Sequence, residues 1–244
     1  MTVRGTVVLA VGVVVAACGG GPKDLAPEPA PDSVLAEAKR LYREGRIGPA
    51  LERLAALTTG ARARGAVAAE AYYYLGEGNF AKGLYLEASR EFRRVADAYA
   101  SHPLAPDALL RAGDALAELW RHPELDPAYG ESAMTTYREL LARFPDSPAA
   151  RRAGLKLAAL AERFAEKDYR NGVFYRRLKA YDSAIIYFRS VVANYAQSSF
   201  APRALLELVE MYRTLEYTEE TRETCDHLRR FYPSAEGVNA TCPP

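Results

Sequence analysis

The strongest constraint on this chain is a pattern of three residues that returns several times at one spacing. A small residue is followed 12 positions later by a second small residue and, four positions after that, by a large apolar one. The two clearest copies are Gly76, Ala88 and Phe92, and Gly172, Ala184 and Phe188; Ala38, Ala50 and Leu54 form a third, and Val209, Thr221 and Cys225 a degraded one. Such a period indicates structural repeats that bury their apolar surfaces by stacking on one another.

Each repeat is predicted to be a pair of antiparallel helices. Ala, Leu, Glu and Arg dominate the body of the chain, and these residues lose little conformational freedom in a helix. The first small residue would let the two helices of a pair approach closely, and the large residue would fill the groove between pairs. We therefore expect an all-α fold with very little sheet.

Two insertions interrupt the regular spacing. Gly113 and Ala133 are 20 positions apart, eight more than in the other copies, and the added residues fall around 122–127, where two prolines rule out a continuous helix. Ala133 and Ala184 are 51 positions apart, which exceeds a standard repeat of about 34 residues by about 17. An apolar stripe within 151–164 accounts for this surplus, so we predict either an extended helix or an additional one there.

The N-terminus has the plan of a bacterial secretion signal. Arg4 precedes an apolar run over residues 6–17, which is shorter than the roughly 20 residues that cross a bilayer as a helix. The run stops at a cysteine, and a Gly/Pro-rich segment follows it. We therefore predict a signal peptide at residues 1–17.

Residues 15–18, Val-Ala-Ala-Cys, resemble the lipobox at which bacterial lipoproteins are cleaved and acylated. This resemblance implies lipidation of Cys18, which would anchor the mature chain to a membrane. Residues 18–31 would then be a flexible Pro/Gly-rich tether between the lipid and the folded body. The alternative is an ordinary secretory signal with an incidental cysteine. Gly19 after the cysteine is similar to lipoproteins that enteric bacteria sort to the outer membrane.

Two more cysteines, Cys225 and Cys242, lie near the C-terminus. A secreted chain reaches an oxidising compartment, where a disulfide between them would tie the C-terminal tail, residues 233–244, to the last helix. Two free thiols are the alternative that the sequence leaves open.

The sequence offers little chemistry for catalysis or for nucleic-acid binding. A net charge of +1 provides no field to attract a polyanion. His102, His122 and His227 lie far apart and lack the spacing of a zinc site, and no glycine-rich phosphate loop or nucleophile elbow is present. We therefore expect a protein that is not an enzyme, with no cofactor, no metal, no nucleic acid and no small-molecule substrate.

Helix pairs with these small-residue positions resemble tetratricopeptide repeats, and a lipobox followed by five such pairs resembles the BamD type of outer-membrane assembly lipoprotein. Residues 166–169, 172–177 and 180–188 look like that family's fourth repeat, and residues 144–147, Phe-Pro-Asp-Ser, are similar to its Tyr-Pro-x-Ser junction. The resemblance implies a right-handed superhelical stack of about five tetratricopeptide-type hairpins over residues 32–232.

The resemblance also implies a function. Members of that family are scaffolds on the periplasmic face of the outer membrane, held there by a lipid anchor, that dock on the barrel protein BamA and help to receive unfolded outer-membrane proteins. The alternative is a periplasmic tetratricopeptide lipoprotein that serves as a scaffold for peptidoglycan, division or pilus machinery.

Candidate partner-binding residues follow from the geometry of such stacks, in which the first helix of each hairpin lines the concave face. Their outward positions are acidic with aromatic interruptions in the first half of the chain and basic in the second half. The candidates are Tyr73, Glu77, Asp114, Glu118, Tyr169, Arg176, Arg177 and Arg213. For the tyrosines at 72–74, packing between helices is the competing interpretation, because three successive residues span most of a helix circumference.

Overall fold

A computed structural model describes residues 29–59 and 63–243. Within these ranges the chain forms eleven helices and no strand, so the all-α prediction, a stack of about five hairpins, is confirmed. The helices are α1 (Pro31–Arg43), α2 (Ile47–Thr58), α3 (Gly65–Ala81), α4 (Tyr85–Ala98), α5 (Ala105–Glu118), α6 (Ala128–Arg143), α7 (Pro148–Arg177), α8 (Tyr181–Asn194), α9 (Phe200–Thr214), α10 (Thr218–Phe231) and α11 (Val238–Thr241). The expected signal peptide, Cys18 and nearly all of the tether lie outside the described residues.

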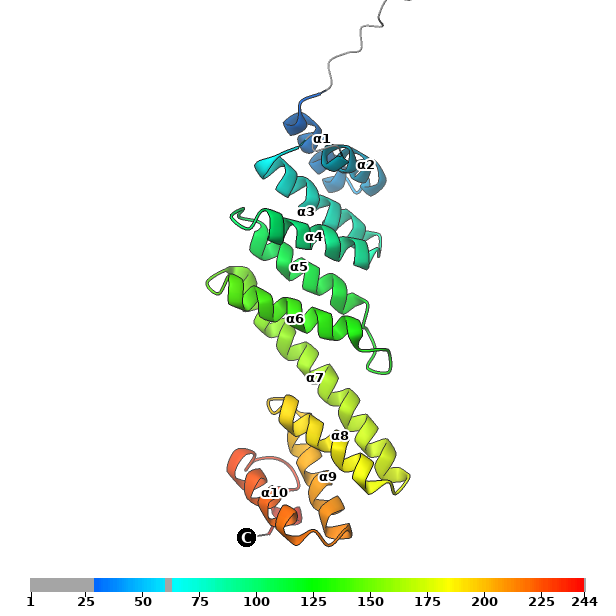
Figure 1. The fold of residues 1–244 in the computed structure, drawn as a ribbon, viewed down its shortest axis with the longest axis vertical. Coiled ribbons are helices and arrows are strands. Elements are labelled where there is room, and N and C mark those ends of the chain that lie inside the picture. Colours follow the sequence, from blue (N-terminus) through cyan, green and yellow to red (C-terminus); the bar gives the residue numbers. More distant parts are fainter. Residues whose placement is uncertain (1–28, 60–62, 244) are drawn as a thin grey trace, which may run out of the picture. The chain divides into compact units, whose positions relative to one another are not determined.

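The ten longer helices pair in chain order into five hairpins, and each hairpin packs on its neighbours in the sequence (Figure 1). The odd-numbered helices α1 to α9 are the first members of the hairpins, and the even-numbered helices α2 to α10 are the second members. Four clusters of buried apolar side chains follow one another along the stack. No helix in the described ranges combines the length and the apolar content that a membrane span needs.

The recurring glycine and the recurring aromatic residue turn out to be direct packing partners. A Cβ atom added to Gly76 would lie 2.7 Å from the ring of Phe92, and the equivalent distance from Gly172 to Phe188 is 2.6 Å. The ring therefore occupies the space that a side chain on the first helix would need, in addition to facing the next hairpin. The sequence interpretation placed the large residue only between hairpins and missed this contact within the hairpin.

The third hairpin keeps the same glycine–aromatic pair, whereas the first and the last hairpins divide the volume differently between the two positions. The third has Gly113 against the ring of Tyr137, with 2.5 Å from the added Cβ to the ring. The first has alanine at position 38 with leucine at 54, and the last has valine at 209 with cysteine at 225; all four are buried. A larger first residue thus accompanies a smaller third one, as close packing requires.

One turn between paired helices recurs in the same backbone conformation. Gly45 and Gly83 have φ values of 75°, and the equivalent residues of two later hairpins, Lys179 and Glu216, have φ values of 59° and 60°. Each lies five positions before the second small residue of its hairpin. The left-handed conformation ends the first helix, and a backbone hydrogen bond such as Leu84 N to Asn79 O closes the turn.

The surplus residues of the fourth repeat lengthen one helix. α7 runs without interruption for 30 residues, which selects the extended helix over an additional one. Its first half packs on α5 and α6, and its second half packs on α8 and α9. Ser147 caps its N-terminus, where the side chain accepts a hydrogen bond from Ala150 N.

The eight-residue insertion forms a loop that is tied to α7. Lys167 Nζ donates to Pro123 O at 2.8 Å, and Arg170 pairs with Glu124 at 2.5 Å. Trp120, fully buried at the start of the loop, stacks on Phe164 of α7 with 4.2 Å between ring centroids. The loop is therefore a packed part of the stack.

Candidate functional site

A series of ion pairs joins the first helices of successive hairpins. Every odd-numbered helix from α1 to α9 is bridged to the next odd-numbered helix by at least one pair with an N···O distance below 3 Å. The pairs are Lys39 with Glu70, Arg111 with Glu77, Lys156 with Asp114, and Arg176 with Glu207. Most of the sequence-predicted candidates on these helices lie in or beside this series.

A cavity of about 290 Å³ opens in the middle of this series, where α3, α5, α6 and α7 meet. Its walls combine two aromatic rings, three cations and two carboxylates. The charged and aromatic residues that line it are Phe80, Arg111, Asp114, Glu118, Tyr137, Lys156 and Arg163. Such a mixture suits a ligand that has both apolar and hydrogen-bonding groups.

Asp114 is the hub of this cavity and is only 9% exposed. The Tyr137 hydroxyl donates to its Oδ1 atom at 2.8 Å, and Lys156 Nζ lies 2.9 Å from the same atom. Arg111 lies 3.4 Å from Oδ2 and also pairs with Glu77 at 2.6 Å. The Arg111 guanidinium further lies over the ring of Phe80, 4.1 Å from its centroid. The buried carboxylate is thus compensated from three sides.

The Tyr137 hydroxyl gives a prediction about alkaline stability. Burial raises the pKa of Tyr137, and the neighbouring Asp114 carboxylate raises it further. The folded protein therefore holds the proton more tightly than the unfolded chain, whose tyrosines ionise near pH 10. This contribution to stability is complete below pH 10 and is lost as the pH rises, by about 1.4 kcal/mol per pH unit. Urea unfolding at pH 9 and pH 11 should show a loss about 1 kcal/mol smaller for Tyr137→Phe than for the wild type; an equal loss would contradict the prediction.

The predicted residues of the first half do not form an acidic groove. Glu77 and Asp114 are neutralised by Arg111 and Lys156, and half-buried Glu118 accepts a hydrogen bond from Arg121 at 3.0 Å. The expectation of an acidic surface was wrong because each carboxylate meets a cation brought close by the fold. Half-buried Tyr73 packs edge-on against Phe92, with ring centroids 5.5 Å apart.

Three of the four candidates in the second half lie on α7. Arg176 pairs with Glu207 at 2.7 Å, and the Tyr169 hydroxyl donates to the same carboxylate at 3.3 Å. Arg177 is exposed and forms no ion pair within the described part of the chain. Arg213 lies apart from these three; it is exposed on α9, where it pairs with Glu210 and donates to Thr241 O.

An exposed apolar pair accompanies Arg177 at the C-terminal end of α7. Phe174 is 56% exposed and Leu178 is 62% exposed, and their spacing of four positions places them on one side of the helix end. Exposed Lys179 follows them in the turn. Large apolar side chains left in solvent beside cations are typical of a surface that another molecule covers.

Sequence reasoning missed Arg111, Tyr137 and Lys156 as site residues. A weak signal for Arg111 was available, because it precedes Asp114 by three positions on a predicted helix. Tyr137 was read only as a packing residue, although its hydroxyl completes the Asp114 site. Among the residues that the structure describes, no group of three or more His, Cys, Asp or Glu side chains is arranged to hold a metal ion.

Comparison with known proteins places the chain among envelope proteins. A family described as YfiO, outer membrane lipoprotein, matches residues 28–228. A protein of Caulobacter vibrioides called outer membrane protein assembly factor BamD is 28% identical over 138 residues, which is 57% of this chain and 45% of the relative. A protein of the same name from Vibrio cholerae is 31% identical over 99 residues, 41% of each chain. The chain thus matches less than half the length of each relative.

A solved structure supports the fold. A tetratricopeptide-repeat protein from Bacteroides fragilis shares 12% sequence identity and gives a TM-score of 0.50, over 86% of this chain and 95% of that one. At this identity the likeness concerns the repeat architecture alone.

Proposed function

Because the chain belongs to the YfiO family of outer membrane lipoproteins, we propose that it is a lipid-anchored periplasmic scaffold of the β-barrel assembly machinery at the outer membrane. The observation that carries this proposal is the family match over residues 28–228, which includes four complete hairpins and most of the fifth. Both curated relatives bear the name of an outer membrane protein assembly factor. The role is one of binding and holding proteins, without catalysis.

In this proposal the chain is divided as the sequence suggests. Residues 1–17 are the signal peptide, the acylated Cys18 is the membrane anchor, and residues 18–31 are the tether. Residues 32–232 are the repeat domain, and residues 233–244 are the C-terminal tail. α1 begins at Pro31, the last residue assigned to the tether.

Unfolded barrel proteins would bind at the cavity around Asp114. An extended chain carries backbone donors and acceptors together with alternating apolar side chains, and the cavity offers partners for both. Lys156 and Arg163 supply donors, and Phe80 supplies an aromatic face. A site built from ion pairs that are already formed needs little rearrangement to accept such a segment.

A BamA-like partner would dock at the end of α7 and the start of the following turn. Phe174 and Leu178 supply exposed apolar area there, and Arg177 and Lys179 supply positive charge that no ion pair among the described residues offsets. Anchoring apolar residues beside cations are the usual composition of a docking surface.

Purification from solubilised envelopes tests the proposal. A tagged wild-type chain should recover a BamA-like barrel protein. The double variant Arg177→Glu with Leu178→Glu should recover at least about tenfold less, because it reverses the charge at position 177 and places a carboxylate in the apolar contact at position 178. Leu155→Glu is the matched control. Leu155 is 75% exposed on the same helix and lies outside both the cavity around Asp114 and the C-terminal end of α7.

Two results would contradict the proposal. Recovery of enzymes or structural proteins of peptidoglycan, division or pilus machinery, with no barrel protein, would favour the alternative scaffold role. Equal loss of the barrel protein in the double variant and in Leu155→Glu would show that the end of α7 is not the docking surface.

A further inference from the structure

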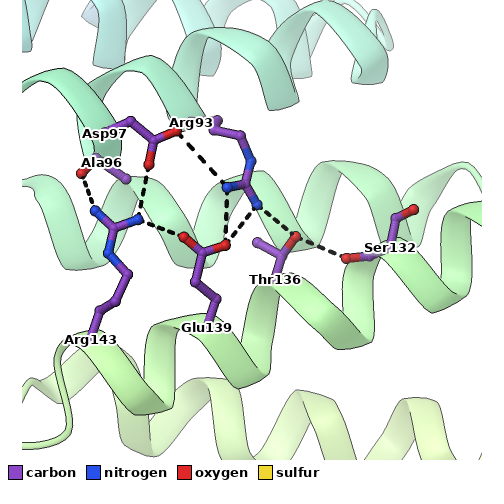
Figure 2. A network of polar contacts seen from close by, with 7 residues as sticks. All are labelled: Arg93, Ala96, Asp97, Ser132, Thr136, Glu139 and Arg143. Carbon is purple, nitrogen blue, oxygen red and sulfur yellow. Dashed lines mark hydrogen bonds and ion pairs between the residues drawn. The ribbon is translucent and has the colours of Figure 1, made fainter.

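An arginine follows the large residue of the pattern in the three middle hairpins, and in two of them it reaches its neighbours. Arg93 on α4 pairs with Glu139 on α6 at 3.0 Å and donates to Thr136 at 3.3 Å, which joins the two helices (Figure 2). Arg189 on α8 donates to the Tyr212 hydroxyl of α9 at 2.7 Å. Arg138 on α6 occupies the same repeat position, is exposed, and forms no hydrogen bond or ion pair within the described residues.

The extension of α7 explains why Arg138 has no hydrogen-bond or ion-pair partner among the described residues. α6 packs on the first half of α7 and α8 packs on its second half, so α8 lies farther along the stack (Figure 1). The contact that Arg93 makes between α4 and α6 therefore has no counterpart between α6 and α8 among the described residues. A groove of about 350 Å³ lies in its place. Its floor is a stripe of small residues on α7, and its walls come from α6 and from the α8–α9 junction. The lining residues include Met134, Arg138, Gly154, Leu157, Ala158, Ala161, Glu162 and Ser198.

Ser198 marks this groove independently of the small residues. At the junction before α7, the equivalent residue Ser147 donates to Phe144 O at 2.8 Å and accepts a hydrogen bond from Ala150 N at 3.1 Å. Ser198 is only 8% exposed, lines the groove, and its Oγ atom has no partner among the described residues. A buried hydroxyl without a partner is costly, so a ligand that supplies one gains from it.

We propose that this groove binds an amphipathic α-helix of a partner protein, which supplies a carboxylate to Arg138 as Glu139 of α6 supplies one to Arg93. Small residues at Gly154, Ala158 and Ala161 let a helix ridge approach α7 closely, as between helices elsewhere in the stack. A Cβ atom added to Gly154 would meet nothing within 4 Å, so the floor is open to such a ridge. Two charged side chains line the groove in the described part of the chain, Arg138 on α6 and Glu162 on α7. Glu162 already accepts hydrogen bonds from Ser199 N and Oγ, whereas Arg138 has no such partner there, so the carboxylate of the occupant would lie against Arg138. This site is separate from the surfaces proposed for the barrel proteins.

A defined peptide tests the proposal. The probe is a fluorescein-labelled helical peptide of about four turns, with leucines three and four positions apart and one glutamate beside them. Its anisotropy should rise saturably with the full chain. Arg138→Gln, or glutamine in place of the peptide glutamate, should each weaken binding about tenfold, and the two changes together should weaken it no further. Arg90→Gln, an exposed arginine on α4, is the charge control.

Filling the groove gives the second arm of the test. Ala158→Trp should abolish saturable binding, while Leu155→Trp, on the same helix and outside the groove, should leave it unchanged. Circular dichroism melting shows that both variants are folded. The proposal is overturned if the wild type shows no saturable binding, or if the two tryptophan variants bind alike. It is also overturned if the wild type is a dimer that Ala158→Trp dissociates, because the groove would then hold a second copy of the chain. No barrel protein takes part, so failure here leaves the assembly role standing.

Discussion

We expect Gly172→Val to lower the free energy of unfolding by about 3 kcal/mol. The first added carbon would lie 2.6 Å from the ring of Phe188, which is fully buried and has no free space to enter. Valine gains only a few tenths of a kcal/mol over glycine in helix propensity, which cannot offset the overpacking. Urea denaturation followed by circular dichroism measures the change.

The matched control is Gly154→Val on the same helix. No atom lies within 4 Å of a Cβ built on Gly154, so its stability should stay within about 0.5 kcal/mol of the wild type. Similar losses for the two valine variants would mean that valine destabilises α7 at any position, and that the loss at position 172 does not come from the contact between Gly172 and the Phe188 ring.

A compensating substitution tests the partnership more directly. The first hairpin fills the same two positions with alanine at 38 and leucine at 54. The double substitution Gly172→Ala with Phe188→Leu reproduces that pair in the fourth hairpin. It should lower the free energy of unfolding by at least about 1 kcal/mol less than the sum of the two single substitutions, because leucine at 188 makes room for the alanine methyl group at 172. Strict additivity would contradict the contact that the structure shows.

The fold could be predicted from the sequence because its determinants are local and periodic. The distance between Gly172 and Phe188 along the chain is set by two helices and one turn, so the steric pair leaves a fixed spacing in the sequence. The extended helix was predicted as one of two options, since the surplus of residues was visible and their arrangement was not. Only the structure showed that the ring of Phe188 covers the glycine itself.

The candidate site was less accessible, because it depends on which charges meet across hairpins. Glu77 and Asp114 were correctly placed on first helices, but their neutralisation by Arg111 and Lys156 involves residues from different helices at irregular separations. The same holds for Arg138, which looks like Arg93 in sequence. Within the described residues Arg138 has no partner, because α8 packs on the second half of the extended α7, and no local sequence pattern encodes that position of α8.

The last hairpin departs from the others in a way that gives its C-terminal tail a structural role. Cys225 stands where the middle hairpins have an aromatic ring, and in the structure it forms a disulfide with Cys242. The tail lies against α9 and α10: Val238 is buried in the last core cluster, and Arg229 donates to Cys242 O at 3.3 Å. Stacked repeats need such a cover on any hairpin face that no other hairpin packs against, and in the described residues the tail lies on that face of the fifth hairpin.

Removing this disulfide should therefore lower the free energy of unfolding by about 3 kcal/mol, since it closes a loop with a sequence separation of 17. The double variant Cys225→Ala with Cys242→Ala is compared with the wild type by urea denaturation, with and without reductant. Reductant should weaken the wild type and leave the double variant unchanged. Hydrogen exchange should quicken in α9, α10 and the tail while α3 to α6 keep their protection, because each hairpin is stabilised by its immediate neighbours. Equal stability of the two proteins, or exchange that quickens evenly along the stack, would show that the tail is not what covers the last hairpin.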